Sequence, residues 1–315
     1  MNLARLSKYV QCCTLLLLWV LGVVAQSKDT AERKKVMVTS SIDRTAQPSY
    51  LYLPANINDN KKRPLVVLLH TWSNDLEQRF EPLEREVARR GWILLEPNFR
   101  GRNDHPEACA SPLAQQDILD AVSWVKQHYS INHGRVYLVG FSGGGYLTML
   151  MAAKYPKQWA AASAWCGISD LTQWYDYHAN DHYGEMMRQC FGGPPQQSDS
   201  IGLQYSLRSP VTHLSKRTKV PLDIAAGRND SIVPPRHSLN AFNVLVKSGG
   251  GKEISNDEVN RVLASSQSSN ATHIVDPVLG RHIYLRQQAG RYRITIYEGK
   301  HDWVPEAAMQ WFDSH

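Results

Sequence analysis

From residue 35 onward, the chain alternates short apolar runs with segments whose apolar residues recur every three or four positions. Residues 65–69 (LVVLL) and 135–139 (RVYLV) are typical of central strands buried on both faces. Residues 76–90 have apolar side chains at helical spacing and are followed by a glycine suited to end a helix. This alternation predicts an α/β fold, a mostly parallel sheet of about eight strands flanked by helices. The predicted strands are 35–40, 48–53, 65–69, 92–96, 135–139, 160–168, 221–225 and 293–297, and the predicted helices are 76–90, 113–129, 143–153 and 305–312.

Two stretches are longer than a simple connection between neighbouring elements. Residues 172–219 are aromatic and rich in glycine and proline, and residues 247–292 contain a serine-rich region. Sheets of this kind bind ligands outside the carboxyl ends of their strands, so insertions there are suited to substrate binding. We therefore expect a single domain over residues 26–315. Its first insertion (172–219) is lid-like and follows the sixth strand, and its second (247–292) precedes the last strand.

The N-terminal segment indicates the compartment. The first 11 residues carry two cations and no acid, an uninterrupted apolar stretch occupies residues 12–24, and small side chains precede a cut after Ala25. This pattern predicts a signal peptide over residues 1–25 and a secreted or periplasmic protein. The alternative is a retained N-terminal anchor, but the apolar stretch is shorter than the roughly 20 residues of a spanning helix. No later segment is long and apolar enough to span a membrane.

Composition and charge exclude other classes of protein. The 315 residues are 43% hydrophobic and 20% charged, which is ordinary for a globular chain. The net charge of +6 includes two N-terminal cations, and no basic cluster with interleaved aromatic residues occurs, so nucleic acid is not an expected partner. The spacing H-E-x-x-H and comparable metal-binding patterns do not occur either, and His178 and His182 lack a convincing third ligand. The sequence does not indicate an oligomeric state.

Three cysteines remain after removal of the predicted signal peptide: Cys109, Cys166 and Cys190. In an oxidising compartment, one disulfide and one buried thiol is the simplest arrangement. Cys109 and Cys190 lie in loops rich in proline and glycine, whereas Cys166 lies in an apolar strand, where a free cysteine behaves as a small hydrophobe. We predict a disulfide between Cys109 and Cys190.

The strongest local signal is the G-x-S-x-G segment at residues 140–144, between a predicted strand and a predicted helix. A serine at such a sharp strand-to-helix turn is exposed at the edge of the sheet, and the glycines avoid clashes where the backbone folds tightly. The N-terminus of the following helix, together with the backbone N–H of Gly143, suits a developing oxyanion. Ser142 is therefore the predicted nucleophile. The alternative is a turn of small residues that only packs helix on strand.

A serine hydroxyl needs a base to take its proton, and the base needs a carboxylate to fix its tautomer. Asp230 follows the strand at residues 221–225, and His301 follows the strand at 293–297, which gives the chain order Ser, Asp, His. Asp170 and Asp223 are the competing acids. The other candidates for the base, interpreted as surface or core residues, are His237, His273 and His282.

The second oxyanion donor should come from the loop after the strand at residues 65–69. We assign this role to the backbone N–H of Thr71 or of Trp72, and the sequence leaves the choice between them open. The first insertion contributes Trp174, Tyr175 and Tyr177, which are suited to stacking on sugars or aromatic acyl groups. The alternative for these aromatic residues is that they pack the insertion onto the body of the domain.

Three segments together resemble the catalytic domain of the prolyl oligopeptidase-like serine hydrolases in the α/β-hydrolase superfamily. They are GFSGGG at residues 140–145, GRNDSIVPP at 227–235 and EGKHDWVPEAAMQWF at 298–312. The resemblance implies an acyl-enzyme mechanism without a cofactor or metal, with Ser142, Asp230 and His301 in the matching roles. The loop after the strand at 65–69 is His-Thr-Trp, whereas many relatives have His-Gly-Gly.

We therefore expect a secreted serine hydrolase whose substrate is a small or polymer-linked carboxylic ester, with carbohydrate-linked or aromatic acyl esters suited to the aromatic insertion. A serine-type peptidase is the main alternative, because relatives of both kinds share these motifs and because Arg188 and Arg208 suit a peptide carboxylate. A non-catalytic binding protein of the same fold is the remote alternative. That class is expected to lack a member of the triad, and none is missing here.

Overall fold

The computed structural model describes residues 32–214, 218–249, 251–264 and 275–315. The predicted signal peptide over residues 1–25 lies outside these described residues. So does His273, one of the histidines considered as an alternative base. In the described part of the chain, no helix has both the length and the apolar character needed to cross a bilayer.

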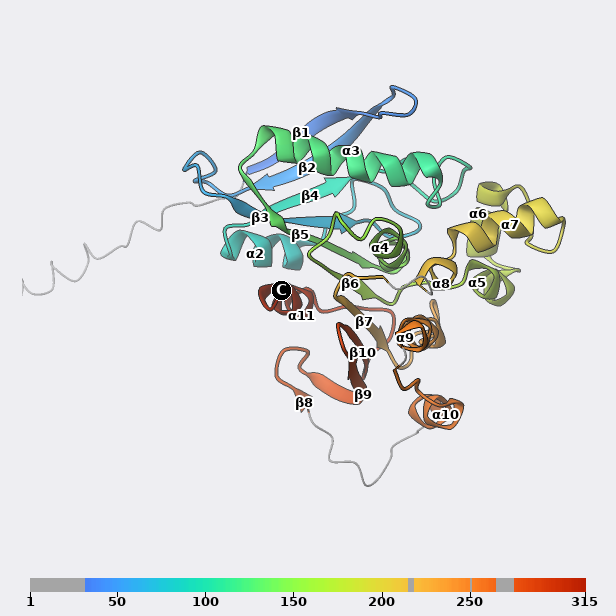
Figure 1. The fold of residues 1–315 in the computed structure, drawn as a ribbon. Helices are drawn as coiled ribbons and strands as arrows, with labels where there is room; N and C mark the ends of the chain where they lie inside the picture. The colour runs from blue at the N-terminus through green and yellow to red at the C-terminus, as the bar shows by residue number, and fades with distance from the viewer. Residues whose placement is uncertain (1–31, 215–217, 250, 265–274) are drawn as a thin grey trace, which may run out of the picture. The chain divides into compact units, whose positions relative to one another are not determined.

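Ten strands form the sheet of the described chain, in the order β1-β2-β4-β3-β5-β6-β7-β10-β9-β8 (Figure 1). All neighbouring strands from β4 to β10 in this order are parallel. The pairs at the two ends of the sheet, β1-β2-β4 and β10-β9-β8, are antiparallel. The strands are β1 Glu32–Thr39, β2 Ala46–Leu53, β3 Arg63–Leu69, β4 Ile93–Pro97, β5 Ile131–Phe141, β6 Ala161–Trp165, β7 Leu222–Gly227, β8 Val275–Asp276, β9 Arg281–Ala289 and β10 Tyr292–Tyr297.

Helices cover both faces of the sheet (Figure 1). One apolar layer lies between the sheet and α3, α4 and α9, and a second lies between the sheet and α2 and α11. The central strands β3 and β6 are buried along their whole length, as the apolar runs predict. The helices are α2 Glu81–Arg89, α3 Pro112–His128, α4 Gly143–Lys154, α5 Leu171–His178, α6 His182–Phe191, α7 Asp199–Arg208, α8 Pro210–Leu214, α9 Arg236–Ser248, α10 Asn256–Ala264 and α11 Pro305–Asp313.

Local sequence signals account for where several helices begin. Ser111 accepts a hydrogen bond from the backbone N–H of Ala114 and precedes Pro112, so α3 begins with a side-chain cap and a residue whose φ is already helical. Asp170 caps α5 by accepting from the N–H groups of Thr172 and Gln173. Capping satisfies backbone donors that have no partner inside the helix.

The predicted alternation of strands and helices is confirmed, and the sheet has two more strands than the eight that were predicted. The additional strands, β8 and β9, lie in the second insertion, after α10. The first insertion consists mainly of the four helices α5 to α8. That this insertion acts as a lid stays a prediction.

Candidate active site

Ser142 lies at the turn between the central strand β5 and α4. Its φ of 59° is in the left-handed region, which costs a non-glycine residue about 1–3 kcal/mol and is typical of functional turns. The turn is crowded by backbone: a Cβ on Gly140 would lie 2.3 Å from the backbone of Gly144, and a Cβ on Gly144 would lie 2.1 Å from the carbonyl oxygen of Leu69. The glycines of the G-x-S-x-G segment are therefore required by space.

The structure brings Ser142, His301 and Asp230 together in one hydrogen-bonded chain. Nε2 of His301 lies 2.9 Å from Oγ of Ser142, and Nδ1 of His301 lies 2.7 Å from Oδ2 of Asp230. The other carboxylate oxygen of Asp230 accepts hydrogen bonds from the N–H groups of Ile232 and Val233, both at 2.9 Å. With Nδ1–H donating to the carboxylate, Nε2 is free to accept the serine proton.

The competing acids have other partners. Asp170 caps α5, and Asp223 accepts hydrogen bonds from Nε of Arg293 at 2.8 Å and from Oγ of Ser163 at 2.9 Å. His237 is buried beside Ser169, and burial lowers the pKa of its imidazole to about 4. The structure thus separates these residues from the serine that the motif identifies.

His301 lies in a short loop between β10 and α11. Oη of Tyr297 and Sγ of Cys166 both donate hydrogen bonds to the carbonyl oxygen of Asp302, the thiol at 3.3 Å. The Asp302 carboxylate accepts from Nη1 of Arg281 at 2.6 Å. These contacts hold the residue that follows His301 by its backbone and by its side chain, and so fix the loop that carries the imidazole.

Two backbone N–H groups near Ser142 are candidates for an oxyanion hole. Gly143 is the first residue of α4, so its N–H has no partner within the helix. A Cβ on Gly143 would lie 2.4 Å from the backbone nitrogen of Trp72, so the two backbones nearly touch. The N–H of Thr71 already donates to Oε1 of Gln78 at 2.8 Å. Of the two N–H groups that the sequence left open, that of Thr71 is thus engaged, so we expect the second donor to be Trp72.

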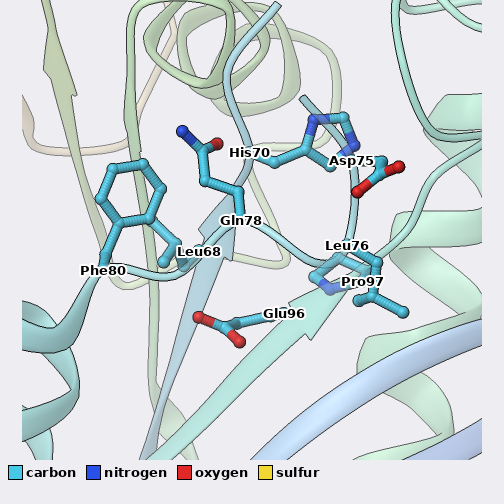
Figure 2. Close-up of a pocket in the computed structure, with 8 residues that line it drawn as sticks. All are labelled: Leu68, His70, Asp75, Leu76, Gln78, Phe80, Glu96 and Pro97. Carbon is cyan, nitrogen blue, oxygen red and sulfur yellow. The ribbon is translucent and has the colours of Figure 1, made fainter. Parts of the chain in front are cut away.

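His70 and Gln78 both contact Thr71, the residue before Trp72, and Figure 2 shows these two side chains beside a pocket. The ring nitrogens of the buried His70 lie 2.9 Å from the carbonyl oxygens of Thr71 and Asn98. Burial lowers the pKa of this imidazole. His70 and Gln78 also line a small pocket together with Glu96 of β4, and none of the three triad members lines it.

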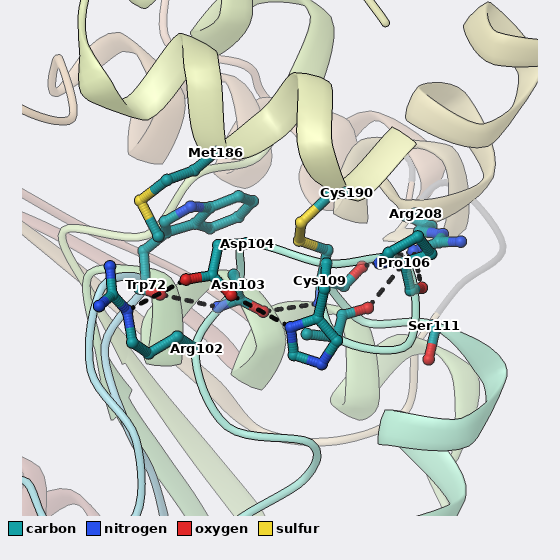
Figure 3. Close-up of a disulfide and its surroundings, with 12 residues drawn as sticks. Trp72, Arg102, Asn103, Asp104, Pro106, Cys109, Ser111, Met186, Cys190 and Arg208 are labelled. Atoms are coloured by element: carbon teal, nitrogen blue, oxygen red, sulfur yellow. Dashed lines mark hydrogen bonds and ion pairs between the residues drawn. A yellow bond between two sulfur atoms is a disulfide. The ribbon is translucent and has the colours of Figure 1, made fainter. Parts of the chain in front are cut away.

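The other side of the Trp72 loop rests on a disulfide-bonded loop (Figure 3). The backbone and the side-chain amide of Asn103 donate to the carbonyl oxygen of Trp72 at 3.0 and 3.4 Å. Oδ1 of Asn103 accepts from the N–H of Cys109 at 2.7 Å. Cys109 is joined to Cys190 of α6, with 6.3 Å between their Cα atoms, so the predicted disulfide is confirmed. It ties the loop after β4 to the first insertion.

Two of the three predicted aromatic residues of the first insertion, Trp174 and Tyr177, contact the acid loop, residues 230–233, which carries Asp230. The side chain of Trp174 is 1% exposed; its Nε1 donates to the carbonyl oxygen of Ile232, and its ring packs edge-on against Trp72 at 4.8 Å. Tyr175 is buried against Tyr205. Tyr177 is 56% exposed, and its hydroxyl donates to the carbonyl oxygen of Ser231. Of the three predicted substrate-binding residues, Tyr177 is the one with a large accessible surface.

Sequence reasoning missed several residues that support the site. Gln78 and Asn103 form hydrogen bonds with the oxyanion loop, residues 70–72, which carries Trp72. Cys166 lies beside Asp230. Burial, reinforced by the negative charge of Asp230, raises the pKa of the Cys166 thiol well above its usual value. No motif marks these residues: Gln78 acts through Thr71, seven residues away, and Asn103 and Cys166 act through segments more distant in the sequence.

Comparison with known proteins gives consistent matches. Residues 79–260 match the model of the prolyl oligopeptidase family. An uncharacterised peptidase, YtmA of Bacillus subtilis, is 27% identical over 49% of this chain and 58% of its own. Acylamino-acid-releasing enzyme 2 of rice is 27% identical over 69% of this chain and 30% of its own. Acetylxylan esterase A of Talaromyces purpureogenus is 25% identical over 38% of this chain and 33% of its own.

Solved structures show the same fold. The acylaminoacyl peptidase of Pyrococcus horikoshii superposes with a TM-score of 0.62 at 18% identity, over 92% of this chain and 41% of its own. A dipeptidyl aminopeptidase IV-like structure from Bacteroides ovatus has a TM-score of 0.65 at 15% identity, over 92% of this chain and 36% of its own. These neighbours confirm the α/β-hydrolase fold. The chain spans 58% or less of the length of these curated relatives.

Proposed function

Because the chain belongs to the prolyl oligopeptidase family, we propose that it is a serine hydrolase that forms an acyl-enzyme at Ser142. The observation that carries this proposal is the hydrogen-bonded chain from Asp230 through His301 to Ser142. The geometry is that required for a base to activate a serine hydroxyl, and the aspartate is buried and anchored by two backbone N–H groups.

In the proposed mechanism, His301 removes the Ser142 proton as Oγ attacks the substrate carbonyl carbon. The resulting oxyanion accepts hydrogen bonds from the N–H groups of Gly143 and Trp72, which the fold has already oriented. His301 then protonates the leaving group, and Asp230 stabilises the imidazolium that forms in between. A water molecule, activated by the same imidazole, releases the acid. None of these steps uses a cofactor or a metal.

For the substrate, we favour a carboxylic ester that is carbohydrate-linked or has an aromatic acyl group. Tyr177 supports this choice, because its exposed ring is anchored through Ser231, the residue that follows Asp230. An aromatic ring at the rim of a site suits stacking on a sugar or an aromatic group. A relative named as an acetylxylan esterase agrees with it. The second candidate is a serine-type peptidase, in agreement with the acylamino-acid-releasing relative.

We also propose that the protein is secreted. The disulfide between Cys109 and Cys190 supports this, because such bonds persist in oxidising compartments.

The test is to label the protein with a fluorophosphonate, map the labelled peptide by mass spectrometry, and measure rates on p-nitrophenyl acetate and on an aminoacyl p-nitroanilide. We expect the label on Ser142, and turnover of the ester well above that of the anilide. Ser142→Ala is the control, expected to lose both label and turnover.

Cleavage of the anilide at a rate comparable to that of the ester would favour the peptidase hypothesis over the esterase hypothesis. A folded protein that takes up no label would contradict the hydrolase itself and favour a binding protein of the same fold.

A further inference from the structure

A buried thiol that the proposed mechanism does not use lies next to the triad. Cys166 directly follows β6, is fully buried, and donates its backbone N–H to the carbonyl oxygen of Ala225 in β7. Its Sγ, a carboxylate oxygen of Asp230 and a ring nitrogen of His301 all lie within 4.8 Å of one another. Three different metal-binding groups therefore converge from β6, from the loop after β7 and from the loop after β10.

We propose that Cys166, Asp230 and His301 form an inhibitory binding site for a thiophilic divalent cation such as Zn²⁺ or Cd²⁺. Sulfur, imidazole nitrogen and carboxylate oxygen are the donors that tetrahedral zinc sites use, with a fourth position left for water. The proposal goes beyond the hydrolase function, because the cation is neither substrate nor cofactor.

The charges at this position suit a divalent cation. A thiolate and a carboxylate together carry two negative charges, which neutralise the cation in a place where an unpaired charge would be costly. Asp230 is already fixed by the N–H groups of Ile232 and Val233, so one ligand is oriented before the cation binds. Zinc bonds of about 2.0 Å to nitrogen and 2.3 Å to sulfur require ligand atoms roughly 3–4 Å apart, so the side chains need to close by only about 1 Å.

Binding requires two proton movements. The cation replaces the proton on Sγ of Cys166, and this proton is released to solvent. Nδ1 of His301, the nitrogen that faces Asp230, becomes a ligand when its proton shifts to Nε2. One proton is released for each cation bound. Nε2 then carries a proton and cannot accept one from Ser142, so the cation inhibits the enzyme by removing its base.

The cation reaches the cluster from the side of His301, whose side chain is 14% exposed, whereas the Asp230 side chain is fully buried. Mg²⁺ and Ca²⁺ prefer sites made of oxygen ligands, and the cluster offers sulfur and nitrogen as two of its three donors. Divalent cations that bind sulfur strongly are therefore expected to inhibit, whereas Mg²⁺ and Ca²⁺, which have the same charge, are not.

The test uses the full chain in chelator-treated buffer, titrated with CdCl₂ and separately with ZnCl₂. One readout is the ultraviolet absorption of the cadmium–thiolate bond, which does not depend on activity. The other is the rate at which a fluorophosphonate labels Ser142, compared with the metal-free rate of the same variant. We expect a cadmium–thiolate absorption to which Cys166 contributes in addition to Cys12 and Cys13 of the full chain, and slower labelling with both cations, but not with MgCl₂.

Cys166→Ser is the informative variant. Its hydroxyl still donates to the carbonyl oxygen of Asp302, so the packing of the His301 loop is retained, but oxygen is a poor ligand for a soft cation. We expect the part of the absorption that comes from Cys166 to be lost, so that this variant absorbs less than the unchanged chain, and the concentration for half-inhibition to rise by about tenfold or more. Cys166→Ala serves the same purpose if the serine variant does not fold. His182→Asn, which changes a histidine of the first insertion, is the control and should bind and respond as the unchanged chain does.

Equal inhibition of Cys166→Ser and the unchanged chain, or a cadmium absorption of equal size in the two proteins, would overturn the proposed metal site. Both forms carry Cys12 and Cys13 alike, so the difference between them reports Cys166. Failure of the hydrolase proposal gives another result, because the metal-free protein would not be labelled while the cadmium absorption could still be measured.

Discussion

At the scale of single residues, the candidate site depends on how closely two backbones approach. Gly143 and Trp72 come from segments 71 residues apart in the chain, yet a methyl group on Gly143 would lie 2.4 Å from the Trp72 nitrogen. The proposed oxyanion hole therefore requires that position 143 has no side chain. The glycine at position 143 is therefore the sequence feature on which the proposed stabilisation of the oxyanion depends.

Gly143→Ala is accordingly expected to reduce kcat/KM by about 100- to 1000-fold, the loss typical of removing one oxyanion donor. The new Cβ must displace the Trp72 backbone, which moves its N–H away from the oxyanion. Rates on p-nitrophenyl acetate measure the effect. Gly134→Ala is the matched control, since its Cβ would meet only Oδ1 of Asn132 at an ordinary 3.5 Å. Equal rates for the two variants would show that the Gly143–Trp72 contact does not form the hole.

The triad residues could be predicted from sequence, because a motif and the chain order Ser, Asp, His mark them and the structure brings these three together. The second proposed oxyanion donor could not be chosen from the sequence. The N–H of Thr71 is engaged by the Gln78 side chain, and no sequence pattern indicates that contact. Nor could the surroundings of Tyr177 and Trp174 be predicted. Both are aromatic residues of α5, and the docking of that helix on the acid loop decides which one is buried.

At the scale of elements, the apolar runs identified the central strands because these are buried on both faces. β3 and β6 are fully buried, and their limits differ from the predicted ones by a few residues. β9 was missed for the opposite reason. Its sequence, RHIYLRQQA, has no apolar run, and none of its residues is fully buried, because it lies near the edge of the sheet. A strand held mainly by pairing with β10 has little hydrophobic signal of its own.

β4 contains an unusual residue for a central strand, the acid Glu96. Its side chain is 7% exposed, and Nη2 of Arg33 is 3.9 Å away, too far for a hydrogen bond. Burial, reinforced by the nearby Glu84 and opposed by Arg33 and Arg79, raises the pKa of Glu96 from 4.5 to about 8. The folded state therefore holds this proton more tightly than the unfolded chain does.

A carboxyl whose pKa is higher in the folded state lowers the free energy of unfolding as the pH rises, here between about pH 4.5 and pH 8. Glu96→Gln keeps the shape and removes the titration. The difference in stability between this variant and the unchanged chain should grow in favour of the variant across that range, by up to about 1.4 kcal/mol per pH unit. Urea unfolding at several pH values measures it. A difference that is constant with pH would contradict the raised pKa, and Glu81→Gln, at an exposed position, is the control.

At the scale of the whole described domain, the order of strands assembles the site. β5, β6, β7 and β10 are consecutive parallel neighbours, so the segments that follow their carboxyl ends, with Ser142, Cys166, Asp230 and His301, meet at one edge of the sheet. The parallel arrangement could be predicted from sequence, because alternating strands and helices require it. The proximity of Cys166 to the triad could not, since it depends on this order and on a backbone turn after β6.

The disulfide is the one covalent link between the loop after β4 and the first insertion in the described part of the chain. Its cysteines are 81 residues apart, and a cross-link that closes a loop of this length reduces the entropy of the unfolded chain, which stabilises the folded state by about 4 kcal/mol. Cys109→Ala/Cys190→Ala should therefore lower the thermal midpoint by roughly 10 °C in calorimetry. Cys166→Ala, which removes a buried thiol without a cross-link, is the control and should cost much less.

The same double variant is expected to lose activity at temperatures where it is still folded. Asn103 connects the disulfide to the oxyanion loop, since it accepts from the N–H of Cys109 and donates to the carbonyl oxygen of Trp72. Releasing Cys109 frees this connection, so kcat should fall while KM changes little, because the oxyanion donor acts mainly in the transition state. A variant that melts at least 5 °C lower but keeps its kcat would show that the disulfide stabilises the fold without positioning Trp72.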